Sequence, residues 1–142
     1  MQATSFPLVS AQNTQPKTRG RWAGRILSGI PVAFLVFDVG IKLAHPAFVT
    51  AASERIGWPD ALTVPLGILL AACTLLYVIP RTAVLGAVLM TGYLGGAIAT
   101  HLRIGDPLFS HTLFPIYVAA MLWGGLYLRD ARVRALVKPA SR

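Results

Sequence analysis

Four long apolar segments, separated by short polar stretches, dominate the sequence. They run over about residues 26–44, 61–79, 83–102 and 113–128. A helix rises about 1.5 Å per residue, so roughly 20 residues match a hydrocarbon core about 30 Å thick. The pattern therefore predicts an all-α integral membrane protein built as a bundle of four transmembrane helices.

The polar stretch after the first span predicts a further short helix. His45-Pro46 ends the first span, because a residue that precedes proline disfavours helical geometry. At helical spacing, residues 47–56 have apolar side chains on one side and polar side chains on the other. Gly57 suits a C-terminal cap. We expect this helix to lie along the membrane interface, with Trp58 as an anchor.

Polar residues at the starts of the other spans suit N-terminal caps. Asp60 is the predicted cap of the second span, Thr82 of the third and Thr112 of the fourth. Pro115 then falls in the first turn of the fourth helix, where its missing N–H does no harm.

The composition supports a membrane protein of one domain. Of the 142 residues, 55% are hydrophobic and 13% are charged. Residues 1–20 are polar and without periodicity, which predicts a disordered tail, and residues 131–142 form a basic tail, leaving 21–130 as the membrane domain. The single cysteine, Cys73, excludes an intramolecular disulfide.

The positive charge is distributed as membrane orientation requires. The net charge is +8, and most of the basic residues lie outside the apolar runs, without the aromatic interleaving typical of nucleic-acid binding. Only Arg55 and Arg103 fall on the side opposite the termini. Lys42 lies inside the first span. The termini and the turn between the second and third spans hold the other ten: Lys17, Arg19, Arg21, Arg25, Arg81, Arg129, Arg132, Arg134, Lys138 and Arg142. The positive-inside rule predicts two cytoplasmic termini. The lack of aromatic interleaving predicts no nucleic-acid partner.

Asp38, Lys42 and His45 form a polar face on the first span. They lie at positions i, i+4 and i+7, so they share one side of the helix. A charge inside the hydrocarbon costs roughly 2.5–3.5 kcal/mol, so Asp38 needs a partner, which Lys42 can supply. The pair is either an ion pair that locks the bundle or part of a proton-handling or ligand-binding face.

A second polar group follows the third span: His101, Arg103, Asp106 and His111. The first and third spans both run outward, so this group and the Asp38 face should meet in the outer half of the bundle. Bundles of this size build sites from side chains on facing helices. We take these seven residues as candidates for ligand binding or proton handling.

Two further features concern metal binding and helix packing. No paired spacing such as HxxxH or HExxH is present, so no metal site is predicted. Gly92, Gly96 and Thr100 form a small-residue stripe on the third span. Such a stripe permits close packing of helices, either within the bundle or at a dimer face.

The string LMTGYLGGAIATHLRIGDP at 89–107, followed by FPIY and LWGGLYLRD, resembles the DoxX-like family of small bacterial four-helix membrane proteins. The resemblance includes Asp38-xxx-Lys42-Leu and the Gly57-Trp-Pro59 turn, and it covers about residues 23–130. It implies a relation to subunits of quinone-reducing sulfur-oxidising complexes or to membrane-associated oxidative-stress assemblies. It supplies no catalytic residues, and the lack of a cysteine pair argues against thiol exchange.

The sequence thus favours a DoxX-like protein of the bacterial inner membrane. We expect an accessory or ligand-binding subunit in quinone-linked or oxidative-stress redox metabolism. It would be a non-catalytic subunit of a membrane oxidoreductase, since no catalytic residue is known. The expected ligand is a small lipophilic molecule, for which a quinone is the candidate; no covalent cofactor motif is present. Asp38 and His101 would handle protons, while Lys42 and Arg103 would supply positive charge. Candidate partners are the lipid bilayer, a redox protein and further copies of the chain. The alternatives are a structural scaffold without ligand chemistry and, with less support, a small transporter or an oligomeric channel.

Overall fold

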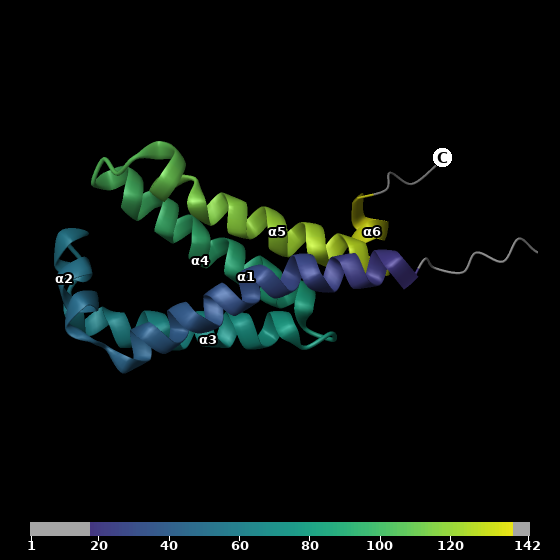
Figure 1. The fold of residues 1–142 in the computed structure, drawn as a ribbon, viewed down its shortest axis with the longest axis horizontal. Coiled ribbons are helices and arrows are strands. Elements are labelled where there is room, and N and C mark those ends of the chain that lie inside the picture. The colour runs from purple at the N-terminus through teal and green to yellow at the C-terminus, as the bar shows by residue number, and fades with distance from the viewer. Residues whose placement is uncertain (1–17, 138–142) are drawn as a thin grey trace, which may run out of the picture.

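The computed structural model describes residues 18–137, which fold into helices joined by short connections, with no strand among them. Four long helices run along the long axis of the molecule, and α2 lies across one end (Figure 1). The elements are α1 (Thr18–Ala44), α2 (Ala47–Arg55), the 3-10 turn η1 (Asp60–Leu62), α3 (Thr63–Val78), α4 (Ala83–Arg103), the π-helical turn η2 (Leu108–Thr112), α5 (Phe114–Arg129) and α6 (Ala131–Val137).

Four helical segments are long and apolar enough to cross a membrane: Arg19–Ala44, Asp60–Val78, Ala83–Arg103 and Leu108–Arg129. The prediction of four transmembrane helices with a short helix between the first two is confirmed. We call the end of the bundle that carries α2 the α2 end. The opposite end carries the start of α1, the α3–α4 turn and α6, and we call it the α6 end (Figure 1).

The four long helices pack as a ring in which each contacts two neighbours. The close pairs are α1–α5, α1–α3, α3–α4 and α4–α5, whereas the diagonal pairs α1–α4 and α3–α5 are not closely packed. Leu70, Tyr77, Met90 and Leu122 are fully buried in the centre. Many apolar side chains on the outer faces of the spans are exposed, as expected of a bundle whose solvent is lipid.

Tyr77 ties three helices together in this centre. Its hydroxyl donates a hydrogen bond to the carbonyl oxygen of Leu122 at 2.7 Å. The hydroxyl of Ser28 lies 2.8 Å from that of Tyr77 and donates to it, since the tyrosine proton is already used. The buried polar groups of α1, α3 and α5 thereby satisfy one another away from water.

Glycines allow the helices to approach one another. A Cβ on Gly86 would lie 2.3 Å from the backbone nitrogen of Tyr77, and a Cβ on Gly125 would lie 2.2 Å from the Ser28 hydroxyl. On Gly24 it would lie 2.8 Å from the carbonyl oxygen of Gly125. The α3–α4 and α1–α5 pairs therefore depend on glycine at these positions.

The two glycines of the predicted small-residue stripe have no packing neighbour in the described chain. A Cβ on Gly92 or Gly96 would have no neighbour within 4 Å, whereas Thr100 donates its hydroxyl to the carbonyl of Gly96 and accepts a bond from the indole of Trp58. Of the two predicted roles, packing within the bundle is therefore not found for Gly92 and Gly96. The dimer-face alternative stays a prediction.

The predicted tails partly belong to helices. Residues 1–17 and 138–142 lie outside the described part of the chain, so the disorder predicted for most of the first tail falls there. Residues 18–20 already form the start of α1, and residues 131–137 form α6. Arginine is a good helix former, so the basic flanks extend the helices beyond their apolar stretches.

Gly57 caps α2 as predicted, but no side-chain cap was found for α3, α4 or α5. Thr82 occupies the N-cap position of α4 as predicted, although its hydroxyl makes no cap bond. The predictions for Asp60 and Thr112 were wrong, because Leu62 and Leu113 are the N-cap residues of α3 and α5. Asp60 bonds His45, Thr82 donates to the carbonyl of Leu76 at 2.8 Å, and Thr112 donates to the carbonyl of Asp106.

The glycine contacts give a matched test of packing. We expect Gly86→Ala to destabilise the protein by about 1–3 kcal/mol, because its methyl group meets the α3 backbone, which cannot move aside. Gly92→Ala has open space and should be neutral or stabilise by roughly 0.5–1 kcal/mol through helix propensity. Unfolding in detergent measures both, and equal effects of the two variants would contradict this packing.

Candidate functional site

Two copies of one short motif form the turns at the α2 end. Arg55-Ile-Gly-Trp-Pro59 ends α2, and Arg103-Ile-Gly-Asp-Pro107 ends α4. In both copies the glycine has a left-handed conformation, with φ of 67° at Gly57 and 69° at Gly105. Glycine takes this conformation without the steric cost that other residues incur.

Both turns are Schellman caps, in which backbone N–H groups after the helix return to its last free carbonyls. In the first turn, Gly57 N–H donates to Glu54 and Trp58 N–H donates to Ser53, at 3.0 and 2.9 Å. The indole N–H of Trp58 reaches the hydroxyl of Thr100 on α4, 3.3 Å away. The first turn is thereby fixed against the end of α4.

The second cap folds Asp106 back over His101. Gly105 N–H donates to Leu102 at 3.2 Å, and Asp106 N–H donates to His101 at 3.1 Å. This backbone geometry brings the Asp106 carboxylate within 2.7 Å of Nδ1 of His101. The glycine cap therefore brings together two side chains that are five positions apart in the sequence.

The two turns hold each other through their arginines. Arg55 of the first turn donates to the Asp106 carboxylate of the second at 2.6 Å. In return, Arg103 of the second turn donates to the carbonyl oxygen of Ile56 in the first. We call this reciprocal arrangement, with the Trp58–Thr100 bond, the double-turn clasp.

Asp106 is the electrostatic centre of the clasp. Its side chain is only 5% exposed, although it carries a carboxylate. The hydrogen bond with His101 and the positive charge of Arg55 hold the pKa of Asp106 below its usual value of 3.8, against the opposing effect of burial. His111 stands nearby, with its ring edge-on to that of His101 at a centroid distance of 5.9 Å, and bonds Ser110.

The polar face of α1 forms a separate group. Lys42 Nζ donates to Asp38 Oδ1 at 2.5 Å, one turn along the helix, and both side chains are partly exposed. The stem of Lys42 lies against Gly67 of α3, where a Cβ would come within 2.9 Å of it. The ion pair therefore sits at the close approach of α1 and α3.

His45 extends this face to the membrane surface. Its φ of 49° places a non-glycine residue in the left-handed region, immediately before Pro46. The backbone N–H of His45 still bonds Ile41, and its Nε2 lies 2.9 Å from Oδ1 of Asp60, the first residue of η1. We call Asp38, Lys42, His45 and Asp60 the α1 polar track.

All seven candidate residues lie at the α2 end, but they form two groups. Asp38, Lys42 and His45 belong to the α1 polar track; His101, Arg103, Asp106 and His111 belong to or adjoin the clasp. No hydrogen bond or ion pair joins the groups within residues 18–137, because α1 and α4 are diagonal in the ring. The predicted convergence thus holds for the end of the bundle and not for one cluster.

Three participants were missed as polar partners in the sequence: Arg55, Trp58 and Asp60. The repeated Arg-Ile-Gly-x-Pro motif would have indicated Arg55, since two identical caps at one end of a bundle are natural partners. Asp60 was assigned to a helix cap, and nothing in its spacing from His45 indicates the bond. Within residues 18–137, no group of three or more His, Cys, Asp or Glu side chains is arranged to hold a metal ion.

The fold and its two polar groups define a small multi-pass membrane protein with its polar chemistry gathered at one end. A family model described as the DoxX-like family matches residues 26–125, and the chain belongs to that family. The match includes the whole of the second and third spans, most of the first and fourth, and both Arg-Ile-Gly-x-Pro turns. No curated protein and no solved structure matches the chain.

The clasp makes the stability of the α2 end depend on pH. Because the pKa of Asp106 is lower in the folded protein, its stabilising effect is complete above about 3.8 and is lost as the pH falls through the lower folded value. We expect Asp106→Asn to reduce the thermal stability at neutral pH and to flatten the loss of stability below about pH 4.

Glu54→Gln is the matched control, since Glu54 is an exposed carboxylate beside Arg55 with no side-chain bond in the described chain. It should leave both the melting temperature and its acid dependence unchanged. If Asp106→Asn melts like the wild type at every pH, Asp106 does not hold the clasp.

Proposed function

We propose that this DoxX-like protein is an accessory, ligand-binding subunit of a redox system in the bacterial inner membrane. It takes up and releases protons for a lipophilic carrier of the quinone class at the α2 end. The observation that carries this proposal is the α1 polar track, a chain of titratable groups that begins inside a membrane span and ends at Asp60 on the surface.

The position of Asp38 is the first support. It lies six residues before the end of a helix that spans the membrane, about 9 Å along the axis, and its side chain is 29% exposed. Ionisable residues at such depth are costly, and in membrane proteins they commonly mark proton or ligand paths. A lock between helices would join two helices, whereas this ion pair lies within one.

The closeness of two bonded pairs in the track is the second support. Asp38 is bonded to Lys42 one turn along the helix, and His45, three residues after Lys42, is bonded to Asp60. Lys42 and His45 share no hydrogen bond within residues 18–137. The imidazole of histidine can accept a proton at one ring nitrogen and donate one from the other. A proton released from a ligand at Asp38 would have a short route to the surface through His45 and Asp60.

The clasp has a supporting role in this proposal. The guanidinium of Arg103 bonds the carbonyl of Ile56 and that of Arg55 bonds Asp106, both within the clasp. The cation beside Asp38 that a ligand oxygen would meet is Lys42, its ion-pair partner. His101 would exchange protons only together with Asp106, its bonded partner. In this proposal the clasp fixes the conformation of the α2 end, and the α1 polar track exchanges protons with the ligand.

The distribution of charge supports an orientation with both termini in the cytoplasm, which places the α2 end on the outer side of the inner membrane. A quinone dissolved in the bilayer would then reach the track from the lipid, and protons would exchange with the outer aqueous phase. An impermeant thiol reagent should label Ser110→Cys in intact cells; labelling only after lysis would contradict this orientation.

A structural scaffold is the second candidate. The clasp favours it, since its charged groups are paired with one another and leave no cation or carboxylate of that cluster free within the described chain. A scaffold would use the α2 end for assembly with a partner protein or another copy. The two candidate functions differ in one requirement: ligand binding needs an ionisable group at Asp38, and a scaffold does not.

A short-chain ubiquinone analogue distinguishes them. We expect the analogue to raise the melting temperature of the purified protein, and Asp38→Asn, which keeps the size and removes the charge, to reduce the apparent affinity about tenfold, since loss of one charge-assisted hydrogen bond costs roughly 1.5 kcal/mol or more. Asp130→Asn, at the α6 end, is the control and should bind as the wild type does.

The double variant Asp38→Leu with Lys42→Met tests the scaffold. Replacing a structural ion pair by apolar groups of similar size is often neutral, so a scaffold should keep its stability and its partners. If the double variant also binds the analogue as well as the wild type, the proposed ligand role of the track is wrong.

A further inference from the structure

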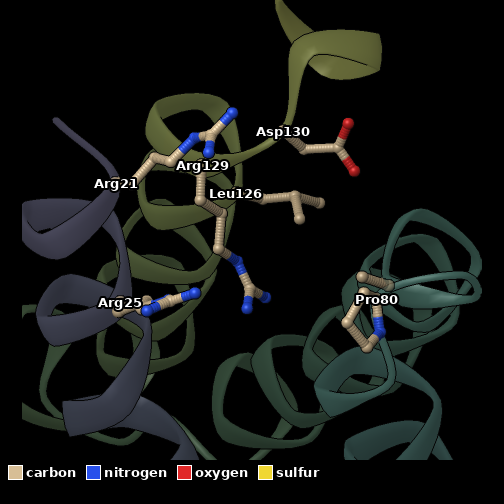
Figure 2. A pocket seen from close by; sticks show the side chains of 7 residues that line it. Arg21, Arg25, Pro80, Leu126, Arg129 and Asp130 are labelled. Atoms are coloured by element: carbon tan, nitrogen blue, oxygen red, sulfur yellow. The ribbon is translucent and has the colours of Figure 1, made fainter. Parts of the chain in front are cut away.

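A second polar region lies at the α6 end, far from both groups described above. A cavity of about 230 Å³ opens there between the start of α1, the end of α5 and the α3–α4 turn. Its polar lining is Arg21, Arg25, Arg129 and Asp130, and its apolar lining includes Pro80 and Leu126 (Figure 2). At about 30 Å³ per water molecule, the cavity has room for a phosphate group and several waters.

The three arginines have no acidic partner in the described chain. Figure 2 shows the Arg25 and Arg129 side chains extending toward the same space from α1 and α5. Arg129 is the most constrained: its guanidinium lies 5.0 Å from the centre of the Tyr77 ring and donates one long bond, 3.5 Å, to the Tyr77 carbonyl. Its Nε is buried and has no partner within residues 18–137.

Asp130 does not neutralise this cluster. Its carboxylate accepts bonds from the side chain and the backbone of Arg132, at 2.8–3.3 Å. Those bonds lower the pKa of Asp130, so its side chain is an ionised carboxylate whose hydrogen bonds go to Arg132. In Figure 2 the carboxylate points away from Arg25 and Arg129.

The rest of the sequence offers no other acidic side chain. The chain has five acidic residues, and Asp38, Glu54, Asp60 and Asp106 all belong to the α2 end. Asp130, the fifth, lines the cavity but forms its ion pair with Arg132, so no acidic side chain is paired with Arg21, Arg25 or Arg129 in the described chain. An external anion can supply the counter-charge.

Close helix packing holds the arginines together against their repulsion. Gly24 allows α1 to touch α5, and a Cβ there would lie 3.1 Å from the backbone nitrogen of Arg129. Arg25 follows Gly24 directly in the sequence, so this contact fixes the distance between the two guanidinium-bearing segments. The site is therefore preorganised by the same packing that forms the bundle.

A second hollow continues from the first into the span. Its volume is about 180 Å³, it shares Arg25 and Arg129 with the cavity, and its other lining residues include Gly29, Val32 and Val78. Arg21, Arg25, Gly29 and Val32 follow one face of α1 at helical spacing, from the charged end toward the apolar middle. The basic cavity and the apolar hollow thus form one continuous surface.

We propose that this surface binds an anionic phospholipid, with its phosphate between Arg25 and Arg129, Arg21 at the rim of the cavity (Figure 2), and an acyl chain along Gly29, Val32 and Val78. Arginine forks match phosphate oxygens and bind them with charge-assisted hydrogen bonds. The same cavity chemistry would accept inorganic phosphate, but the apolar hollow that continues from it favours a lipid. Basic pockets between spans are suited to such headgroups.

Native mass spectrometry and thermal shift on the purified full chain test the proposal, with phosphatidylglycerol, phosphatidylcholine and inorganic phosphate as separate probes. We expect phosphatidylglycerol to stay bound and to stabilise the protein more than the other two. Arg25→Gln with Arg129→Gln should weaken phosphatidylglycerol at least about tenfold, the effect of losing one charge-assisted bond or more.

Arg19→Gln with Arg81→Gln is the matched control. It removes the same charge from two exposed residues of the α6 end that do not line the cavity, and it should change the affinity less than about twofold. Equal weakening by both double variants would mean attraction by net charge alone, which overturns the proposal. Equal binding of phosphatidylcholine, or equal stabilisation by inorganic phosphate, would also overturn it.

Arg129 contacts Tyr77, so its replacement could reduce folding. Arg21→Gln with Arg25→Gln keeps Arg129 and changes only exposed residues of α1. If this variant keeps the circular dichroism spectrum of the wild type and binds phosphatidylglycerol equally well, the arginine cavity is not the lipid site.

Discussion

A bundle that crosses lipid has to neutralise the charges that it carries, and this chain has few carboxylates with which to do so. Four of its five acidic residues lie at the α2 end and only Asp130 lies at the α6 end. Burying or crowding unpaired charge is costly, so each end has a different solution. At the α2 end the chain pairs its own charges. At the α6 end it keeps an arginine cavity whose proposed counter-ion comes from the surroundings.

The same packing produces both ends. Tyr77, buried between α1, α3 and α5, is bonded to Ser28 and Leu122, and its ring carries the guanidinium of Arg129. Gly24 and Gly125 set the α1–α5 distance near Arg129, and Gly67 sets the α1–α3 distance beside Lys42. The glycines that set the distances between helices thus lie on the faces where neighbouring helices touch. The exposed glycines of α4 make no such contact in the described chain.

The sequence was informative where one helix or one rule decides the outcome. Apolar length predicted the four spans, and the left-handed cap at Gly57 followed from glycine chemistry. It was uninformative where the partner of a side chain comes from another element. Asp60 and Thr82 suit helix caps by position, yet His45 and the end of α3 use their oxygens. The clasp needs two distant turns to meet, which no local pattern predicts, although the repeated motif was visible.

The central claim is that Asp38 changes its protonation state when a quinone is bound and reduced at the α2 end. Infrared difference spectroscopy of the full chain with isotope-labelled aspartate measures this directly. Reduction of a quinone to a quinol takes up electrons, which an electrode supplies in this experiment, and protons. The account predicts an aspartate band that changes on this reduction of a bound ubiquinone analogue, shifts with the label and is absent in Asp38→Asn. A difference spectrum without any aspartate band, or with the same band in Asp38→Asn, would contradict it.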